Sequence, residues 1–390
     1  MATLAQTLFP ARTAPSQSPT ASRVTAFLAR AGVRINPSNP APWDLVVHDA
    51  RFYDAVARDG SIGFGESYMA GWWDCASLDA LFTRLCMVPK AKTRGWEKFM
   101  LKVASRLLNL QSKARAHQVI DAHYELSNEM FAKMLDPQMQ YSCAYWDGVD
   151  NLDAAQERKL ALIAEKLPLE PGMQVLEIGC GWGGLAAHLA KHHGVHVTAV
   201  NICQAQLQVA RERCAGLPVT FVDADYRDIT GQYDRVVSVG MFEAVGAKNF
   251  DAFMGVVHRC LRDDGVFLLH TIGENLDRVT ADPWIVKYIF PNGYIPSLDK
   301  LTKAMEGRFV VEDLHNIGPH YDRTLMAWVA RFEAAWPEIA AMGFDERFRR
   351  MWTYYLHNCA GAFRGRSLQL WQIVSTRYRS GTHYARVAAS

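Results

Sequence analysis

Paired cysteines are missing from this 390-residue sequence, because its eight cysteines occur singly and none forms a CxxC motif. Such spacing argues against a zinc site or a redox couple. Free thiols are typical of proteins in a reducing compartment, so we expect a cytoplasmic protein.

Long apolar runs and a strong charge of either sign are also missing. No stretch reaches the roughly 18 apolar residues of a membrane-spanning helix, which excludes an integral membrane protein. The formal net charge of +2 is too small to indicate a nucleic-acid partner. The length exceeds what one hydrophobic core usually covers, so we expect two domains or one domain with a large appendage.

Acidic residues are missing from the first 43 positions, which contain four Arg and many Ala, Ser, Thr and Pro. Without a continuous apolar core this segment is not a secretory signal peptide. We expect residues 1–40 to be a disordered leader, and an organelle transit peptide fits the same composition.

Two short segments follow the leader. Residues 41–88 contain the motif GESYMAGWWDC, whose Tyr68, Trp72 and Trp73 are dense enough to pack a small, mainly helical domain that we expect to contact lipid. Residues 89–120 are rich in Lys and Arg, with Glu97 as an isolated acid, and their apolar residues recur every three or four positions. This pattern predicts a basic amphipathic linker helix.

The rest of the chain, residues 121–390, alternates apolar strand patterns with helical patterns, which predicts a doubly wound, parallel α/β sheet. The seven expected strands are 174–179, 196–202, 219–225, 234–242, 265–273, 309–318 and 367–377. An insertion at 274–308, rich in aromatic residues and proline, is expected to form a lid or pocket wall. Leu325, Val329, Phe332 and Trp336 recur at helical spacing and predict a helix that caps the same site.

A glycine-rich motif, VLEIGCGWGG, follows the first of these strands and precedes a helix. Gly179, Gly181 and Gly183 allow a sharp turn and a close approach of the backbone to a ligand. A dinucleotide site is the alternative, but the spacing E-x-G-x-G-x-G, with Glu177 at the strand end, does not match it. The motif resembles that of class I S-adenosylmethionine methyltransferases, where the loop holds the amino-acid half of the cofactor.

Polar residues after the second and third strands are candidates for the rest of the cofactor. Asn201 can bind a ribose hydroxyl through its amide, and Gln206 can assist from the next helix. Asp225, Tyr226 and Arg227 lie where an adenine needs a polar partner and a flat wall. An ordinary exposed turn is the alternative for these three residues.

Five motifs, in order, resemble the bacterial cyclopropane fatty acid synthase family over nearly the whole folded chain. They are FYDAVARDGSIGFGESYMAGWWDC, HYELSNEMFAKMLDPQMQYSCAYW, VGMFEAVGAKNF, LLHTIG and YYLHNCAGAFRGR. The resemblance implies methylene addition from S-adenosylmethionine to cis double bonds of phospholipid acyl chains. It also implies a homodimer that associates peripherally with the inner face of the cell membrane.

The resemblance further implies site residues. Tyr141 and Ser142 would join the cofactor pocket. A small polar centre, which in the family holds a bicarbonate ion, would comprise Cys143, Glu243, His270, Ile272 and Tyr321. Two positions depart from the family pattern: Ala244 replaces the usual His, so that imidazole is missing, and Asn201 replaces a more common Thr.

The proposed chemistry explains why such residues are needed. An alkene is a poor nucleophile, so it must be held against the sulfonium methyl in a dry apolar pocket. The carbocation that results is stabilised by aromatic faces and would be quenched by water. Ring closure then needs a base that does not trap carbon, and bicarbonate oriented by Glu243, His270 and Tyr321 meets this need.

Several residues also have simpler interpretations. His270 could be a structural hydrogen-bonding residue, Cys143 a small buried apolar residue, and Cys359 is expected to be core. We expect no metal at His188, His192, His193 and His196, which straddle a helix end and a strand start. A fatty acyl methyltransferase with a methyl-branched product and a catalytically dead lipid-binding homologue are the alternative functions.

Overall fold

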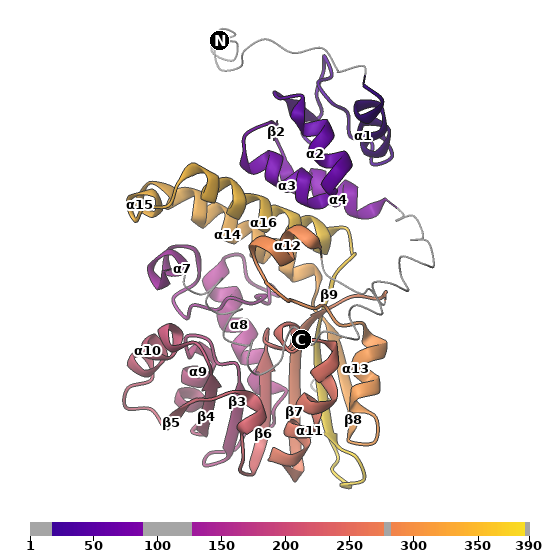
Figure 1. The fold of residues 1–390 in the computed structure, drawn as a ribbon. Helices are drawn as coiled ribbons and strands as arrows, with labels where there is room; N and C mark the ends of the chain where they lie inside the picture. Colours follow the sequence, from indigo (N-terminus) through magenta and orange to yellow (C-terminus); the bar gives the residue numbers. More distant parts are fainter. Residues whose placement is uncertain (1–17, 89–126, 277–281, 387–390) are drawn as a thin grey trace.

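The computed structural model describes residues 18–88, 127–276 and 282–386. The N-terminal helices lie at one end of the molecule and a seven-stranded sheet lies at the other (Figure 1). Two long helices, α14 (Pro319–Ala334) and α16 (Glu346–Arg364), lie between them. The predicted basic helix at 89–120 lies outside the described residues.

The sheet contains all seven strands predicted from the sequence, with small shifts at their ends. Its strand order is β5-β4-β3-β6-β7-β9-β8. The strands are β3 (Gln174–Ile178), β4 (His196–Asn201), β5 (Val219–Asp223), β6 (Tyr233–Val239), β7 (Leu261–Gly273), β8 (Phe309–Asn316) and β9 (Gln369–Arg377).

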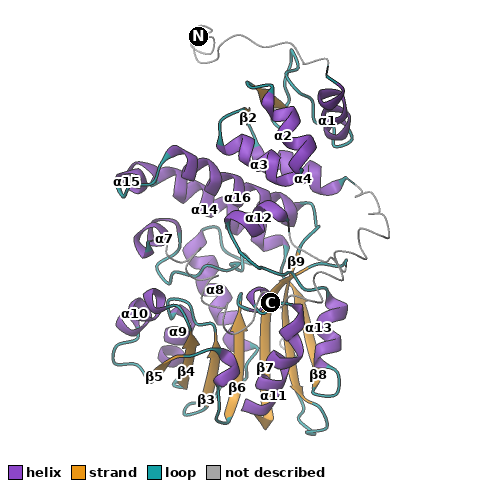
Figure 2. Ribbon diagram, viewed as in Figure 1, coloured by secondary structure: helices purple, strands orange, loops and turns teal. Residues whose placement is uncertain are grey.

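Helices cover both faces of the sheet, as the α/β prediction requires (Figure 2). One face packs against α8 (Leu152–Glu165), α9 (Gly184–His193) and α10 (Gln204–Arg213). The other packs against α11 (Phe250–Cys260) and α13 (Leu298–Met305). Successive residues of β3, such as Val175 and Leu176, enter opposite cores because side chains alternate along a strand.

The prediction of an all-parallel sheet is wrong for one strand. β9 pairs antiparallel with both β7 and β8. It lies between them in the sheet, and its residues from Gln369 to Thr376 are buried on both faces, as in the parallel strands. A strand pattern in the sequence does not indicate the direction of the strand, which depends on how the preceding α16 returns the chain to the sheet.

The prediction of a disordered leader is wrong for residues 19–29, which form α1 (Pro19–Ala29). Ser18 caps this helix through its hydroxyl, and Ala21, Val24 and Leu28 are buried on one face. The apolar face of this segment is short and contains an alanine, so it is a weak helix signal in the sequence. The segment is helical because this face packs against α2 (Arg51–Asp59). Residues 1–17 lie outside the described residues.

The N-terminal domain is mainly helical, as predicted, with α3 (Ser61–Met69), α4 (Leu78–Met87) and a two-stranded sheet of β1 (Leu45–Val47) and β2 (Trp73–Cys75). Trp73 is fully buried, and its indole N–H donates to the backbone oxygen of Phe64 (3.2 Å) and to Ser67 Oγ (3.0 Å). Trp72 is half-buried, with Arg51 above its ring. The aromatic motif therefore forms the domain core, as expected.

This domain is joined to the rest of the chain through α16. Tyr354 contacts the rings of Phe64, Tyr68 and Phe82, and Arg350 binds Asp74 (2.8 Å). The helices approach so closely that a Cβ at Gly361 would lie 2.5 Å from that of Phe82. One hydrophobic core therefore extends from the N-terminal domain into α14 and α16.

We expect Gly361→Ala to lower the free energy of unfolding by about 1–3 kcal/mol, because the added methyl overpacks the contact between α16 and α4. Urea unfolding measures this change. Gly255→Ala in α11 is the matched control, since a Cβ there meets no described atom within 4 Å and should raise stability by up to about 1 kcal/mol. Equal effects of the two substitutions would contradict the close contact.

The described parts of the 274–308 insertion are packed against both domains. In α12 (Pro283–Tyr288), Trp284 is fully buried against Tyr354 and against the backbone at Gly65. Tyr294 follows and donates its backbone N–H to the backbone oxygen of Glu243 (2.9 Å). The insertion thus reaches the predicted polar centre, while residues 277–281 lie outside the described residues.

Among the helices in the described ranges, none is both long enough and apolar enough to span a bilayer.

Candidate active site

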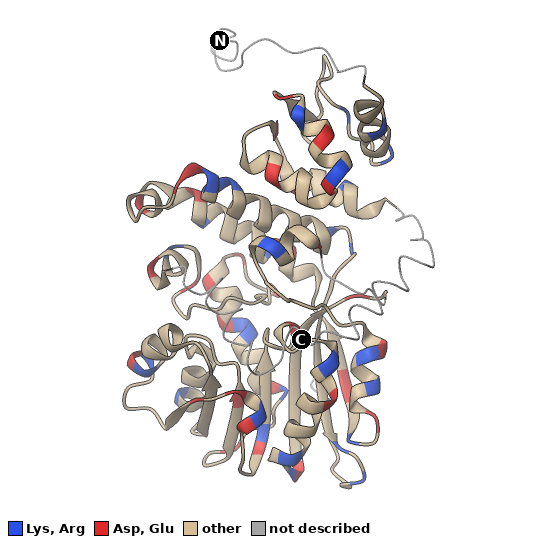
Figure 3. Cartoon of the chain, in the orientation of Figure 1, with Lys and Arg blue, Asp and Glu red and all other residues tan. Residues whose placement is uncertain are grey.

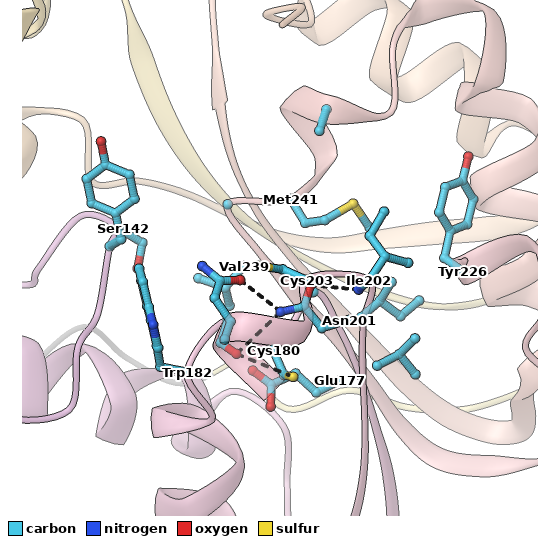
Figure 4. Close-up of a pocket in the computed structure, with 18 of the residues that line it drawn as sticks. Ser142, Glu177, Cys180, Trp182, Asn201, Ile202, Cys203, Tyr226, Val239 and Met241 are labelled. Carbon is cyan, nitrogen blue, oxygen red and sulfur yellow. Dashed lines mark hydrogen bonds between the residues drawn. The ribbon is translucent and has the colours of Figure 1, made fainter. Parts of the chain in front are cut away.

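A cavity lies beyond the carboxyl ends of β3, β4, β5 and β6. All of the predicted cofactor residues except Gly183 line it: Tyr141, Ser142, Glu177, Gly179, Gly181, Asn201, Gln206, Asp225, Tyr226 and Arg227. Ser142 and Trp182 lie on one side, Tyr226 lies on the other, and Asn201 lies between them (Figure 4). This is where ligands bind in open α/β sheets.

The glycine loop has backbone conformations that favour glycine. Gly179 and Gly181 have φ of 87° and 52°. A Cβ at Gly179 would lie 2.6 Å from that of Met241, whereas a Cβ at Gly181 would meet no described atom within 4 Å. Gly181 therefore faces open space, which is the fit expected of a loop that holds a ligand against its backbone.

Gly183 has a different role from the one predicted. It is the N-cap of α9, with φ of 77°. A Cβ at this position would lie 2.9 Å from that of Ala210, so glycine is needed for the packing of α9 against α10. The three glycines are regularly spaced, so the sequence does not indicate which of them face a ligand and which allow two helices to pack closely.

Asn201 and Gln206 bind each other in the structure. Asn201 Nδ2 donates to Gln206 Oε1 (2.9 Å), and Asn201 Oδ1 accepts from the backbone N–H of Ile202 (2.9 Å). Asn201 Nδ2 also donates to the backbone oxygen of Gly181 (3.4 Å). Both side chains line the cavity as predicted, and they also connect the end of β4 to the glycine loop and α10.

Asp225, Tyr226 and Arg227 form the far wall of the cavity. Asp225 accepts from the backbone N–H of Arg227 (2.9 Å) and pairs with its guanidinium (3.0 Å). The ring of Tyr226 packs on Phe253, with centroids 5.3 Å apart. The wall is therefore built into the core rather than being an ordinary exposed turn.

A buried lysine supports the opposite end of the cavity. Lys159 on α8 is fully buried, and its ammonium group donates to the side-chain oxygen of Gln140 and to Ser142 Oγ (3.1 Å). Burial lowers the pKa of Lys159 to about 8, with Asp136 acting in the opposite direction. Burial raises the pKa of Glu177 to about 8, and Lys159 opposes that shift. The two groups stabilise each other's charge inside the protein.

Lys159 and several lining residues were missed by the sequence reasoning. The lining also includes Gln140, Cys180, Trp182, Met241, Ala244 and Val245. A signal for Lys159 existed, because it lies four residues from Ala155 and from Ile163, both of which are buried on α8. Ala244, which the sequence analysis noted as a departure from the family pattern, lies on the cavity wall beside the predicted cofactor residues.

Glu243, Ile272 and His270 of the predicted polar centre lie together at the ends of β6 and β7. The backbone N–H of Ile272 donates to Glu243 Oε1 (2.5 Å), and His270 lies two residues earlier on the same strand. Glu243 Oε2 and His270 Nε2 are buried and have no hydrogen-bond partner among the described residues. Burial raises the pKa of Glu243 and lowers that of His270 well below its ordinary value, so both favour neutral forms.

Cys143 and Tyr321 are brought to the same place by α14. The backbone N–H of Ala144 donates to Thr324 Oγ1 (3.1 Å), and Thr324 lies three residues beyond Tyr321 on the helix. Burial raises the pKa of Tyr321 well above its ordinary value, and nearby Cys143, Tyr141 and Glu243 raise it further. Burial likewise raises the pKa of Cys143, so its thiol stays protonated.

Aromatic rings enclose this region. Trp328 on α14 packs against Tyr141 (5.2 Å between centroids) and Tyr321 (6.0 Å). Tyr321 also packs on Phe363 (4.6 Å). The predicted capping helix is α14, but Trp336 begins the next helix, α15 (Trp336–Ala341), and the aromatic wall comes from Tyr321 and Trp328. Cys359, on α16, is packed against the adjoining hydrophobic core, as expected.

The histidines on α9 form a separate cluster. Ligand atoms of Glu157, His188 and His192 lie within 4.8 Å of one another, and Glu157 is 3.1 Å from His188 Nδ1. The structure shows this Glu–His pair, and the expectation that no metal binds here stays a prediction.

Comparisons with known proteins place the chain in a family. The family model for mycolic acid cyclopropane synthetase matches residues 111–373, which is more than half of the chain. The cyclopropane-fatty-acyl-phospholipid synthase of Escherichia coli is 53% identical over 92% of this chain and 94% of its own length. A tuberculostearic acid methyltransferase of Mycobacterium tuberculosis is 35% identical over 87% of this chain and 85% of its own.

Solved structures agree, and they confirm the predicted class I methyltransferase fold. A cyclopropane synthase of Mycobacterium tuberculosis has a TM-score of 0.63 and 30% identity, and it covers 67% of this chain and 98% of its own. A mycolic acid cyclopropane synthase complexed with SAH and CTAB has a TM-score of 0.62 and 32% identity, with the same coverage. The chain therefore belongs to the mycolic acid cyclopropane synthetase family of S-adenosylmethionine-dependent methyltransferases.

Proposed function

We propose that this enzyme adds a methylene group from S-adenosylmethionine to cis double bonds of unsaturated phospholipid acyl chains, forming cyclopropane rings. One observation carries the proposal: the cofactor cavity adjoins a buried centre in which Glu243 Oε2 and His270 Nε2 have no partner within the described part of the chain. The identity to the Escherichia coli synthase extends over the N-terminal domain as well, which supports a phospholipid substrate.

Residues of the glycine loop would hold the cofactor, which supplies an electrophilic methyl group when bound. Gly181 leaves the space that such a ligand needs, and Ser142 and Asn201 offer polar atoms at its sides. Lys159 fixes Ser142 from behind, so this end of the cavity is ordered before a ligand enters.

Aromatic residues would hold the alkene and exclude water. Tyr141, Trp328 and Tyr321 form a continuous wall of rings. Their faces attract a cation and contain no strong nucleophile that could capture it. The wall therefore favours loss of a proton over the addition of water.

The polar centre would hold a bicarbonate ion, which accepts the proton lost at ring closure when it is bound. The donor set fits such an ion, because a neutral His270 and Tyr321 can donate hydrogen bonds to its oxygens. Glu243 Oε2 can interact with its hydroxyl group. Both Oε2 and Nε2 would thereby gain the partners that the described residues do not provide.

Mass spectrometry of phospholipid acyl chains tests the proposed function. The protein is expressed in a host without such an enzyme, and we expect each modified chain to gain the mass of one methylene. Proton NMR then distinguishes ring methylene protons, which resonate at high field, from a methyl branch. The alternative function is a fatty acyl methyltransferase with a methyl-branched product, and the tuberculostearic acid methyltransferase is a related enzyme. Branched chains without rings would favour this alternative.

Bicarbonate should be required for full activity. In carbonate-free buffer we expect turnover to fall and then to recover when bicarbonate is restored. His270→Ala and Tyr321→Phe should each cost about tenfold or more, because each removes a donor to the same ion. Their effects should not add. Full activity without bicarbonate, or strictly additive losses, would indicate that a side chain is the base.

We also propose that the enzyme binds anionic bilayers through the basic segment at 89–117 and the neighbouring small domain at 41–88, with each basic residue contributing about 1 kcal/mol near such a surface. In the described part, Lys and Arg are interspersed with Asp and Glu (Figure 3). Charge reversal of Lys98, Lys102 and Arg106 should weaken cosedimentation with anionic vesicles.

The control for that experiment reverses three exposed charges on the catalytic domain: Lys191, Arg211 and Lys303. It changes the net charge equally and should leave binding unchanged. An equal loss of vesicle binding in both variants, or binding that does not change with lipid charge and salt concentration, would contradict the proposal. The homodimer is likewise a proposal, and sedimentation velocity tests it against the mass of one 43.8 kDa chain.

A further inference from the structure

Gln372 is a buried polar residue to which the proposed mechanism gives no role. It lies on β9 directly opposite His270 on β7, and both side chains are fully buried. Gln372 Nε2 is 3.3 Å from His270 Nδ1. The amide is therefore the neighbour that interacts with the inner nitrogen of this imidazole.

The structure places the amide nitrogen of Gln372, and not its oxygen, towards the ring, and this orientation determines the position of a proton. An amide NH₂ group can only donate, so Nδ1 of His270 must accept. Burial keeps the ring neutral by lowering its pKa, and a neutral imidazole carries a single proton. That proton must then be on Nε2, the nitrogen that has no partner among the described residues.

We propose that Gln372 is a positioning residue that holds His270 in the Nε2–H tautomer, so that the free nitrogen presents a donor rather than a lone pair. A donor can bind an anion, whereas a lone pair would repel it. The effect on turnover rests on the proposed function, but the tautomer itself does not.

NMR of protein with ¹⁵N-labelled histidine tests the tautomer without cofactor or lipid. His270→Asn identifies the His270 signals by their loss. We expect the wild type to show a protonated Nε2 and an unprotonated Nδ1. Gln372→Glu should reverse this pattern at a pH above the pKa of the new carboxyl group, because the carboxylate then accepts from Nδ1–H, and Gln372→Leu should give a mixture. A wild type protonated on Nδ1, or a pattern unchanged in both variants, would overturn the proposal.

Kinetics then separates positioning from a structural role. Gln372→Leu should lower kcat about tenfold while KM for S-adenosylmethionine stays unchanged, since one donor to the anion is misplaced. Gln369→Leu is the matched control: it is a buried glutamine on the same strand that donates to the backbone oxygen of Arg366 (2.9 Å). If Gln372→Leu does not fold, Gln372→Glu, which keeps the size, replaces it in the assay.

The two experiments also distinguish the possible failures. Loss of activity with an unchanged tautomer would show a merely structural role and overturn the inference. The expected tautomers in a protein that never modifies phospholipids would support the inference and refute the proposed function.

Discussion

Glu243→Gln should lower turnover by at least about 100-fold, because it misplaces the proposed bicarbonate base, and a positioned base usually contributes at least this much. A glutamine can still accept the Ile272 N–H through its oxygen, so the local backbone is retained. It places an NH₂ group where Glu243 Oε2 lies, and this group cannot accept a hydrogen bond from the hydroxyl group of the proposed bicarbonate ion. Steady-state kinetics measures the loss.

Affinity for S-adenosylhomocysteine should stay nearly unchanged in this variant, because Glu243 does not line the cofactor cavity. Titration calorimetry measures that affinity. Glu312→Gln is the control: Glu312 accepts from Thr376 (2.7 Å) on the outer strands of the sheet, and its loss should leave turnover intact. Near-normal turnover in Glu243→Gln, or a parallel loss of cofactor binding, would remove Glu243 from the reaction centre.

Gly181→Val should weaken cofactor binding by at least about 100-fold, because two added methyl groups occupy space that a ligand otherwise fills. The protein should still fold, since the new Cβ meets no described atom within 4 Å. The positive φ of 52° imposes a strain of about 1–2 kcal/mol. Titration with S-adenosylhomocysteine and urea unfolding measure the two effects separately.

Gly216→Val separates strain from ligand contact. Gly216 also has a positive φ, of 80°, and open space at its Cβ, but it lies in an exposed turn outside the cavity. We expect a similar loss of stability with normal cofactor affinity. If both variants bind the cofactor normally, the glycine loop is not the cofactor site.

The sequence by itself determined the local features of this protein. Strands such as β3 and β4 were predictable because their signal, an apolar run between turn residues, is contained in a few consecutive residues. The loop at Gly179 and Gly181 was predictable because glycine tolerates a positive φ whatever its tertiary contacts. The candidate site followed from motifs whose spacing is also local, together with a family resemblance.

Tertiary structure alone decided features that depend on distant partners. The direction of β9 is set by its insertion between β7 and β8, and α1 is held by its contact with α2. Gly183 allows α9 to pack closely against α10. Lys159 can be buried because Gln140 and Ser142 accept hydrogen bonds from its ammonium group. The pairing of Gln372 with His270 joins residues that are 102 positions apart. Burial and hydrogen bonding across such separations leave no periodic pattern in the sequence, because they arise only when the strands and helices pack together.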